Sequence, residues 1–221
     1  MTKLINCKYR FGMTGTLDGT QTHRLVLEGL FGKVEKVTST KELMDKDTLA
    51  SLKIKCLVLK HKENECKEVK DLKYSEELQY IVAHKTRNDF ISRLCDKLNG
   101  NTLCLYQLVE KHGLVLYNMM KDFDRKVFFI HGGTDTETRE KIRAITEKET
   151  NAIIVASYGT FSTGINIRNL HNIVFASPSK SRIRVLQSIG RGLRKSDKGD
   201  IRTTLLAVSY THLRAHETTR H

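Results

Sequence analysis

Two arginines near the end of the chain have the residue type and spacing of a phosphate-binding pair. They lie in residues 187–194, which read QSIGRGLR. Positions three apart share a face of a helix, so Arg191 and Arg194 can project toward one target. The planar guanidinium suits phosphate oxygens, and a glycine such as Gly190 lets another backbone come close. Taken alone, the pattern is equally typical of a basic helix end that faces solvent.

A second segment with suitable chemistry is residues 157–166, which read SYGTFSTGIN and follow an apolar run. Its hydroxyls and backbone amides could hold phosphates of a nucleic acid or a nucleotide. Glycine, serine and threonine populate any turn, so this hydroxyl-rich loop is weak evidence by itself. About 21 residues separate Asn166 from Gln187, which is room for one strand and the start of one helix. We therefore expect the loop and the arginine helix at the same edge of a sheet, which favours phosphate binding over a solvated surface.

The elements that must position these groups alternate along the second half of the chain. The hydrophobic pattern predicts strands and helices in turn over residues 102–106, 110–120, 126–130, 134–147, 152–156, 172–176, 181–193 and 203–207. This alternation predicts an α/β fold with a mainly parallel sheet and helices on both faces. Aromatic residues inside the strands are expected in the core rather than as base-stacking platforms; these are Tyr106, Phe128, Phe129 and Phe175.

Parallel sheets bind ligands at the carboxyl ends of their strands. That rule selects Gln107, residues 131–133, the loop at 157–166 and residues 177–178. The glycine amides at Gly132 and Gly133 could touch a DNA backbone, but an ordinary strand-ending turn explains them equally well.

The first half of the chain is less regular. We expect short strands at 9–16 and 33–37, a helix at 22–30, a helical turn at 40–44 and a strand at 52–59. The charged segment 61–73 is predicted to be a surface loop, followed by a helix at 76–83. A capping box at 86–89 predicts a second helix over 87–98, whose apolar stripe contains Phe90, Ile91, Leu94, Cys95 and Leu98.

Composition narrows the class of protein. The 221 residues carry a formal net charge of +13, which favours a polyanionic partner, above all nucleic acid. No apolar run is long enough to span a membrane and no signal peptide is recognisable, so we expect a cytoplasmic protein. The five cysteines include no CxxC pair and are expected to be buried, reduced thiols. The nine histidines show no paired-ligand spacing, so no metal site is expected.

With these segments in place, the chain resembles the superfamily 2 helicases. Residues 187–194 resemble their motif VI (QxxGRxxR), and residues 163–166 resemble motif V. Residues 9–16 resemble the strand leading to motif III, with Thr14, Gly15 and Thr16 in place of Ser-Ala-Thr, and residues 103–107 match the placement of motif IV. The stretches ASYGTFSTGI, TDTETR, NLHNIVFA and VLQSIGRGLRK are most similar to UvsW-type recombination and repair helicases of phages, and the resemblance covers about residues 8–206.

The resemblance implies a RecA-like motor of two domains that couples ATP hydrolysis to remodelling of branched DNA and DNA–RNA hybrids. Residues 1–50 would then be the C-terminal end of the first motor domain, and residues 51–207 a truncated second motor domain. Residues 208–221 lack periodicity and resemble translated sequencing-adapter sequence, so we expect a non-native tail there.

The resemblance also implies roles for individual residues. At the nucleotide it implies Arg194 as arginine finger, assisted by Arg191 and Gln187, and contacts from Gly164, Asn166 and Gly190. At the nucleic acid it implies Thr163, Ser162, Thr160, Gln107 and Gly132, while Thr14, Gly15 and Thr16 would couple hydrolysis to strand movement. Asn166 stands where many relatives carry Asp, and Arg168 where related families often carry Pro.

No GxxxxGK[ST] loop and no DExx box occur in the sequence. Those elements cradle phosphates and hold Mg²⁺, so we expect ATP with Mg²⁺ to be held mainly by a missing N-terminal motor domain, and this chain alone to be inactive. Two alternatives stay open at this point. One is a nucleic-acid-binding module without enzymatic activity, and the other is a fragment of an RNA helicase.

Overall fold

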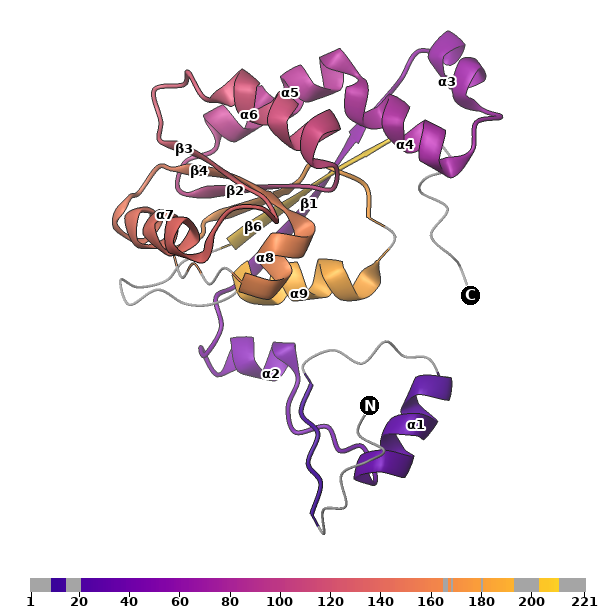
Figure 1. The fold of residues 1–221 in the computed structure, drawn as a ribbon, viewed down its shortest axis with the longest axis vertical. Coiled ribbons are helices and arrows are strands. Elements are labelled where there is room, and N and C mark those ends of the chain that lie inside the picture. Colours follow the sequence, from indigo (N-terminus) through magenta and orange to yellow (C-terminus); the bar gives the residue numbers. More distant parts are fainter. Residues whose placement is uncertain are drawn as a thin grey trace.

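The computed structural model describes residues 9–14, 21–164, 167, 169–179, 181–192 and 203–210, and these contain one six-stranded sheet. Its strand order is β1-β6-β5-β2-β4-β3, and neighbouring strands all pair in parallel (Figure 1). The strands are β1 (Leu52–Leu59), β2 (Thr102–Tyr106), β3 (Val127–Ile130), β4 (Ile153–Ser157), β5 (Asn172–Phe175) and β6 (Thr203–Tyr210). The prediction of a parallel α/β sheet is confirmed.

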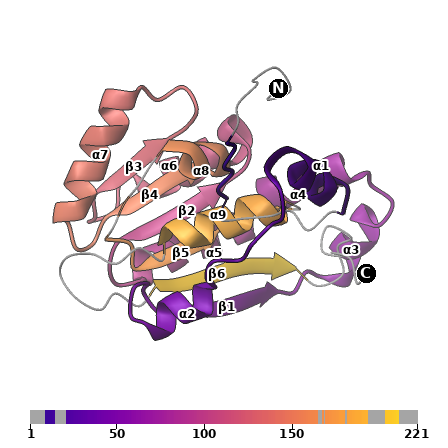
Figure 2. The same cartoon turned by 90° about the horizontal axis from the view of Figure 1, so that it is seen from below.

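Helices cover both faces of this sheet (Figures 1 and 2). On one face lie α5 (Lys85–Lys97), the π-helical turn η2 (Val109–Gly113) and α6 (Leu114–Met120). On the other face lie α7 (Thr136–Lys148), α8 (Tyr158–Gly164) and α9 (Arg182–Gly192). The remaining helices are α1 (Gln21–Phe31), α2 (Thr40–Asp45), α3 (Glu63–Val69) and α4 (Tyr74–Ala83).

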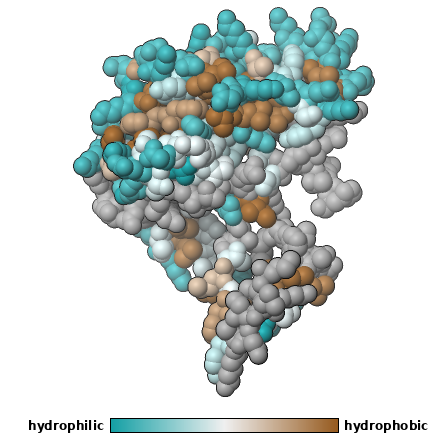
Figure 3. All heavy atoms as spheres, viewed as in Figure 1, coloured by the Kyte–Doolittle hydropathy of each residue, from teal (hydrophilic) through white to brown (hydrophobic). Residues whose placement is uncertain are grey.

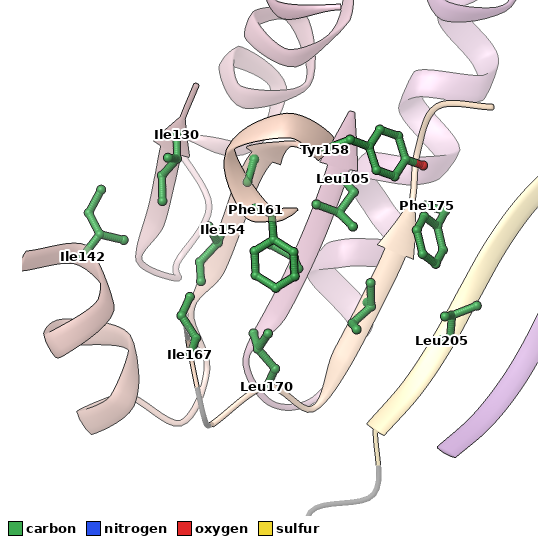
Figure 4. Close-up of a cluster of buried hydrophobic side chains, with 13 residues drawn as sticks. Leu105, Ile130, Ile142, Ile154, Tyr158, Phe161, Ile167, Leu170, Phe175 and Leu205 are labelled. Carbon is green, nitrogen blue, oxygen red and sulfur yellow. The ribbon is translucent and has the colours of Figure 1, made fainter. Parts of the chain in front are cut away.

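Two hydrophobic clusters form the core, one against each face. Along β2, Leu103 and Leu105 point into the cluster under α7, α8 and α9, while Cys104 and Tyr106 point into the cluster under α5 and α6. This alternation follows from the two-residue period of a strand. Figure 4 shows the first cluster, in which Phe161 of α8 is completely buried between the strands and the helices. A buried side chain of this size stabilises the fold by roughly 2–3 kcal/mol.

The predicted surface loop at 61–73 is wrong, because residues 63–69 form α3. The Glu65 carboxylate accepts the backbone N–H of Lys62 at 3.3 Å and thereby caps the first turn. Val69, at the end of the helix, is only 4% exposed and packs with Ile81 of α4. One apolar anchor is enough here because the rest of the segment consists of residues that favour helix formation.

The predicted start of α5 is also wrong. The helix begins at Lys85, and Nδ1 of His84 accepts the backbone N–H of Arg87 at 3.3 Å, so the cap is a histidine rather than the expected threonine. The expected apolar stripe of this helix is confirmed, since all five of its residues belong to the core cluster on that face.

Residues 158–164 form a helix, so the prediction of a hydroxyl-rich loop is wrong. Ser157 Oγ accepts the backbone N–H of Thr160 at 3.2 Å and caps α8. Tyr158 and Phe161 lie three positions apart on one face and are both buried. Burial of these two rings turns a sequence of Gly, Ser and Thr into a helical turn.

The N-terminal part lies away from the sheet in Figure 1. Residues 9–14 and 33–37 form no strand, contrary to prediction, and Tyr9, Phe11 and Met13 are exposed. Hydrophobic residues appear at the surface of this lower part in Figure 3. The helix α1 ends at Gly32, whose φ of +87° suits glycine.

Three further outcomes concern the last strand, the cysteines and membrane helices. Strand β6 runs to Tyr210 and buries Val208, so excluding residues 208–210 from the fold was wrong; residues 211–221 lie outside the described part. Cys95 and Cys104 are buried as expected, whereas Cys56 is exposed on β1, an outer strand of the sheet. None of the described helices is long and apolar enough to cross a membrane.

Candidate nucleic-acid interface

A cleft of about 660 Å³ opens at the carboxyl edge of the sheet. Its walls come from the residues that follow three neighbouring strands: Gln107 and Val109 after β2, Gly132 after β3, and residues 157–160 at the end of β4. Arg139 of α7 completes the lining. The expectation that Gln107, Gly132 and the segment after β4 converge at one edge is therefore met by the geometry.

The loop that carries Gln107 is fixed by a serine from the next loop. The backbone N–H of Gln107 donates to Ser177 Oγ at 3.0 Å, and Ser177 Oγ lies 2.7 Å from Nδ1 of His112. Because Ser177 Oγ accepts from Gln107, its hydroxyl proton is available to donate to His112. This serine ties the exits of β2 and β5 together.

The contacts of His112 continue this chain into the interior. Nε2 of His112 lies 3.2 Å from Asn88 Oδ1 and 3.4 Å from Arg87 Nη1, and Asn88 Nδ2 donates to the Val82 carbonyl at 2.8 Å. Burial, together with the nearby Arg87 guanidinium, lowers the pKa of His112 to about 3, so the ring is neutral at physiological pH. The histidine is completely buried. The cleft thus rests on a buried, directional hydrogen-bond chain.

The fully buried Arg87 lies beside this chain. Desolvation lowers its pKa to about 10, which still leaves the guanidinium charged at neutral pH. It donates to the carbonyl of Ala176, the residue before Ser177. Arg87 therefore holds the same loop from its other side.

Arg139 was not among the residues selected from the sequence. Its Nη2 donates to the Gly132 carbonyl at 2.9 Å, while its Nε is buried without a hydrogen-bond partner in the described part of the chain. None of the ion pairs found between described residues includes Arg139. It is a cation in the cleft whose charge is not matched by a neighbouring carboxylate. Arg139 is the last residue of the stretch TDTETR, which contributed to the family resemblance and to a predicted helix start but was not assigned a role in binding.

The two glycines after β3 lie in different surroundings, and this bears on whether they contact DNA or only form a turn. The backbone N–H of Gly133 donates to Nδ1 of its neighbour His131 at 3.1 Å, as in an ordinary turn. Gly132 faces the cleft, and a Cβ built there would meet no atom within 4 Å. Only Gly132 is open to a ligand.

The hydroxyl residues of α8 differ in what can be said of them. Thr160 lines the cleft, but its hydroxyl is buried and lies 2.7 Å from Ser157 Oγ, which gives it a structural role at the helix cap. Its contact with nucleic acid stays a prediction. Gly164 ends α8. The side chains of Ser162 and Thr163, and all of Asn166, lie outside the described residues.

Helix α9 packs against α8, and its Val185 and Ile189 pack against the core cluster that contains Phe161; none of its described side chains lines the cleft. Gln187 is exposed on this helix, and a Cβ at Gly190 would meet no atom within 4 Å, so this side of α9 is open. The predicted pairing of Arg191 with Arg194 stays untested, because the Arg191 side chain and residue 194 are not described. The same holds for the coupling residues Gly15 and Thr16, while Thr14 is exposed.

A family model for the helicase conserved C-terminal domain matches residues 85–196. The chain belongs to this helicase family. It is 36% identical over 203 residues to the ATP-dependent DNA helicase uvsW of Enterobacteria phage T4, a match that covers 90% of this chain and 40% of the relative. The chain therefore spans about 40% of the length of the curated relative.

Solved structures agree with this assignment. The crystal structure of T4 UvsW matches with a TM-score of 0.62 and 34% identity, over 82% of this chain and 35% of that one. The type ISP restriction-modification enzyme LlaBIII bound to DNA matches with a TM-score of 0.55 at 15% identity, over 90% of this chain and 14% of that one, and shows the shared fold alone. The resemblance to UvsW-type superfamily 2 helicases is confirmed, as is the RecA-like fold.

Membership of the helicase family implies nucleotide use. The described residues could form one wall of a nucleotide site, because Gln187 and Gly190 leave the outer side of α9 open. The sequence contains no loop of the GxxxxGK[ST] type to hold the phosphates.

Proposed function

We propose that this chain is a fragment of an ATP-dependent DNA helicase that contains most of the second motor domain, and that its cleft holds the nucleic-acid backbone. The observation that carries this proposal is the position of Arg139. Its guanidinium lies in a cleft at the carboxyl edge of the sheet, together with the loop of Gln107 and the open Gly132. A cation, a side-chain amide and an unobstructed backbone are the groups that contact phosphate and sugar.

The electrostatics of the chain support an anionic ligand in this cleft. The net charge of +13 attracts polyanions over a long range, and Arg139 concentrates charge at one point. Arg143, one turn further along α7, provides a contrast. Arg143 forms ion pairs with Glu140 and with Glu147, and its distance to Glu147 Oε2 is 2.8 Å. Carboxylates therefore balance the charge of Arg143.

This difference gives a matched test. Binding of the chain to fluorescently labelled single-stranded and branched DNA is measured by anisotropy over a series of salt concentrations. Arg139→Gln should weaken binding and reduce the slope of log K against log salt by about 1, as expected for the loss of one phosphate contact. Arg143→Gln removes the same formal charge and should leave the slope close to that of the wild type.

Equal slopes for the wild type and Arg139→Gln would refute the assignment of the cleft. Parallel titrations with RNA and with DNA–RNA hybrids report on the substrate. Tighter binding to RNA than to every DNA form would favour the RNA helicase alternative. We place branched DNA and DNA–RNA hybrids first because the chain is 36% identical to a UvsW helicase and resembles that type of helicase in its motifs.

The second half of the proposal concerns ATP. Arg194 serves as arginine finger with Arg191 and Gln187 beside it, and Gly164, Asn166 and Gly190 lie next to the nucleotide. Bound ATP with Mg²⁺ supplies the free energy of strand movement, and the missing N-terminal motor domain holds most of its phosphates. Support comes from the resemblance to motifs V and VI and from the open side of α9.

The finger assignment is tested in the full-length parent protein. Arg194→Ala should reduce DNA-stimulated ATP hydrolysis by roughly 10³–10⁵, the effect typical of an arginine finger, with DNA binding retained. Normal turnover by this variant would refute the assignment. A parent without any DNA-stimulated hydrolysis would favour the non-enzymatic binding module.

The N-terminal segment supports the presence of a partner domain. Tyr9, Phe11, Met13, Leu25 and Val26 are all more than half exposed, which is unusual for large apolar side chains so close together in sequence. We assign residues 1–50 to the end of the first motor domain, where these side chains would pack and Thr14, Gly15 and Thr16 would couple hydrolysis to movement. The site of action would be the cytoplasm of the phage's host.

A further inference from the structure

Two histidines and a glutamate from separate segments meet beside α3, outside the cleft and away from α9. His61 follows β1, Glu65 lies in the first turn of α3, and His84 joins α4 to α5. Nδ1 of His61 lies 3.1 Å from Glu65 Oε2, and Nε2 of His84 lies 3.8 Å from Glu65 Oε1. The imidazole rings stand edge to face with centroids 4.7 Å apart. One potential ligand atom from each residue lies within 4.8 Å of the others.

We infer that His61, Glu65 and His84 form a binding site for one divalent transition-metal ion of the Zn²⁺ type. Zinc binds nitrogen and carboxylate oxygen at about 2.0–2.2 Å, so neighbouring ligand atoms in a tetrahedral site lie about 3.3 Å apart. The nitrogen–oxygen distances of 3.1 Å and 3.8 Å involve different oxygens of the Glu65 carboxylate, so a small rotation of that side chain brings one oxygen and both nitrogens to a common ion. Two imidazoles and one carboxylate suit zinc, whereas magnesium and calcium prefer oxygen ligands alone.

The surroundings leave room for the ion. The three residues line a hollow of about 300 Å³. Their side chains are 5%, 32% and 18% exposed for His61, Glu65 and His84, so solvent reaches the site from the glutamate side and can supply water as the fourth ligand. Lys60 and Lys62 also line the hollow but are exposed, and their flexible stems let the ammonium groups stay in water. The hydrogen bond from His61 lowers the pKa of Glu65, which keeps the carboxylate charged.

Metal binding competes with two hydrogen bonds, because an ion at Nδ1 of His61 replaces its contact with Glu65 and an ion at His84 changes a helix cap. Nδ1 of His84 accepts the N–H of Arg87 at 3.3 Å, so Nε2 carries the proton of the neutral ring. An ion at Nε2 displaces that proton, and Nδ1 takes a proton instead, which ends the cap contact. The long distance makes this contact one of the weaker hydrogen bonds of the fold.

The bound ion would add a polar link between three parts of the chain that already pack together through Leu59, Val69 and Ile81. It connects the exit of β1 and the start of α3 to the junction of α4 and α5. The spacing of His61 and Glu65, four positions apart, is visible in the sequence. His84 follows 23 positions after His61, and only the fold brings it near, which is why no metal site was expected.

The test uses the 221-residue chain stripped of metal with EDTA. Titration calorimetry with Zn²⁺ and absorption spectroscopy with Co²⁺ are carried out at pH 7 on the wild type, His61→Asn, Glu65→Gln and Glu68→Gln. Glu65→Gln keeps an oxygen for the N–H of Lys62, so α3 stays capped. Glu68 is exposed on the same helix and serves as the matched control.

The wild type and Glu68→Gln should bind one more ion per chain than the other two variants, and zinc should raise the thermal unfolding midpoint only in these two proteins. The cobalt spectrum should show a tetrahedral site without a thiolate charge-transfer band. The same stoichiometry in all four proteins would overturn the inference. A thiolate band lost with Cys66→Ser would also overturn it, because the ion would then be held by a cysteine.

Discussion

The neutral, buried His112 makes the stability of this domain depend on pH in a defined direction. In the folded chain its pKa is lowered to about 3, by burial first and by the Arg87 charge second. In the unfolded chain an imidazole titrates near pH 6.5. The unfolded state therefore binds a proton that the folded state does not bind, and stability is lost as the pH falls below about 6.5.

The size of the effect follows from this difference. Between pH 7 and pH 5 the folded ring stays neutral, while the unfolded ring goes from mostly neutral to almost fully protonated. The free energy of unfolding should therefore fall by about 2 kcal/mol from His112 alone. This value is insensitive to the folded pKa, provided that the pKa stays below about 4.

The assay is urea unfolding followed by circular dichroism, on the wild type and His112→Gln at pH 7 and pH 5. Glutamine can donate to Asn88 and accept from Ser177, but it does not titrate. The variant should therefore lose about 2 kcal/mol less than the wild type between the two pH values. His171→Gln should reduce the pH dependence by less, because the ring of His171 is partly exposed. An equal loss in the wild type and His112→Gln would refute the reasoning.

Two further predictions concern the stability of the fold. Arg125 donates to four backbone carbonyls at and just beyond the end of α5, so Arg125→Lys should lower the free energy of unfolding by about 2–3 kcal/mol in urea titrations, and an unchanged value would contradict this role. A Cβ at Gly113 would lie 2.4 Å from the ring of Tyr106, so Gly113→Ala should cost about 1–3 kcal/mol in the same assay. Gly159→Ala is the control: a Cβ there meets no atom within 4 Å, and the variant should be as stable as the wild type or more so.

The strands could be predicted because their hydrophobic runs are buried on both faces. All residues of β2, β4 and β5 are buried, so each strand appears in the sequence as a short apolar run. Turn segments contain too many polar residues to show such a run. Helices α3 and α8 were missed for the opposite reason. Each depends on one or two buried side chains, such as Val69 or Phe161, within a segment whose composition is polar. Tertiary packing overrides composition in both places.

The sequence predicted those residues of the cleft that directly follow a strand. The rule for parallel sheets selects Gln107 and Gly132, and both line the cleft. The same rule cannot select Arg139, which reaches the cleft from a helix, nor His112, whose contact with Ser177 spans 65 positions. Such contacts depend on how helices lie on the sheet, and no short sequence pattern records that arrangement.

Because residues 158–164 form a helix rather than a loop, they connect the cleft and α9 rigidly. A loop there would be a soft connection between the cleft and the arginine helix. Instead, α8 lines the cleft with its first residues and also packs against α9. Phe161 anchors α8 in the core. If nucleic acid in the cleft and nucleotide at α9 influence each other within this domain, a displacement of α8 is the direct physical route, because a packed helix moves as a unit.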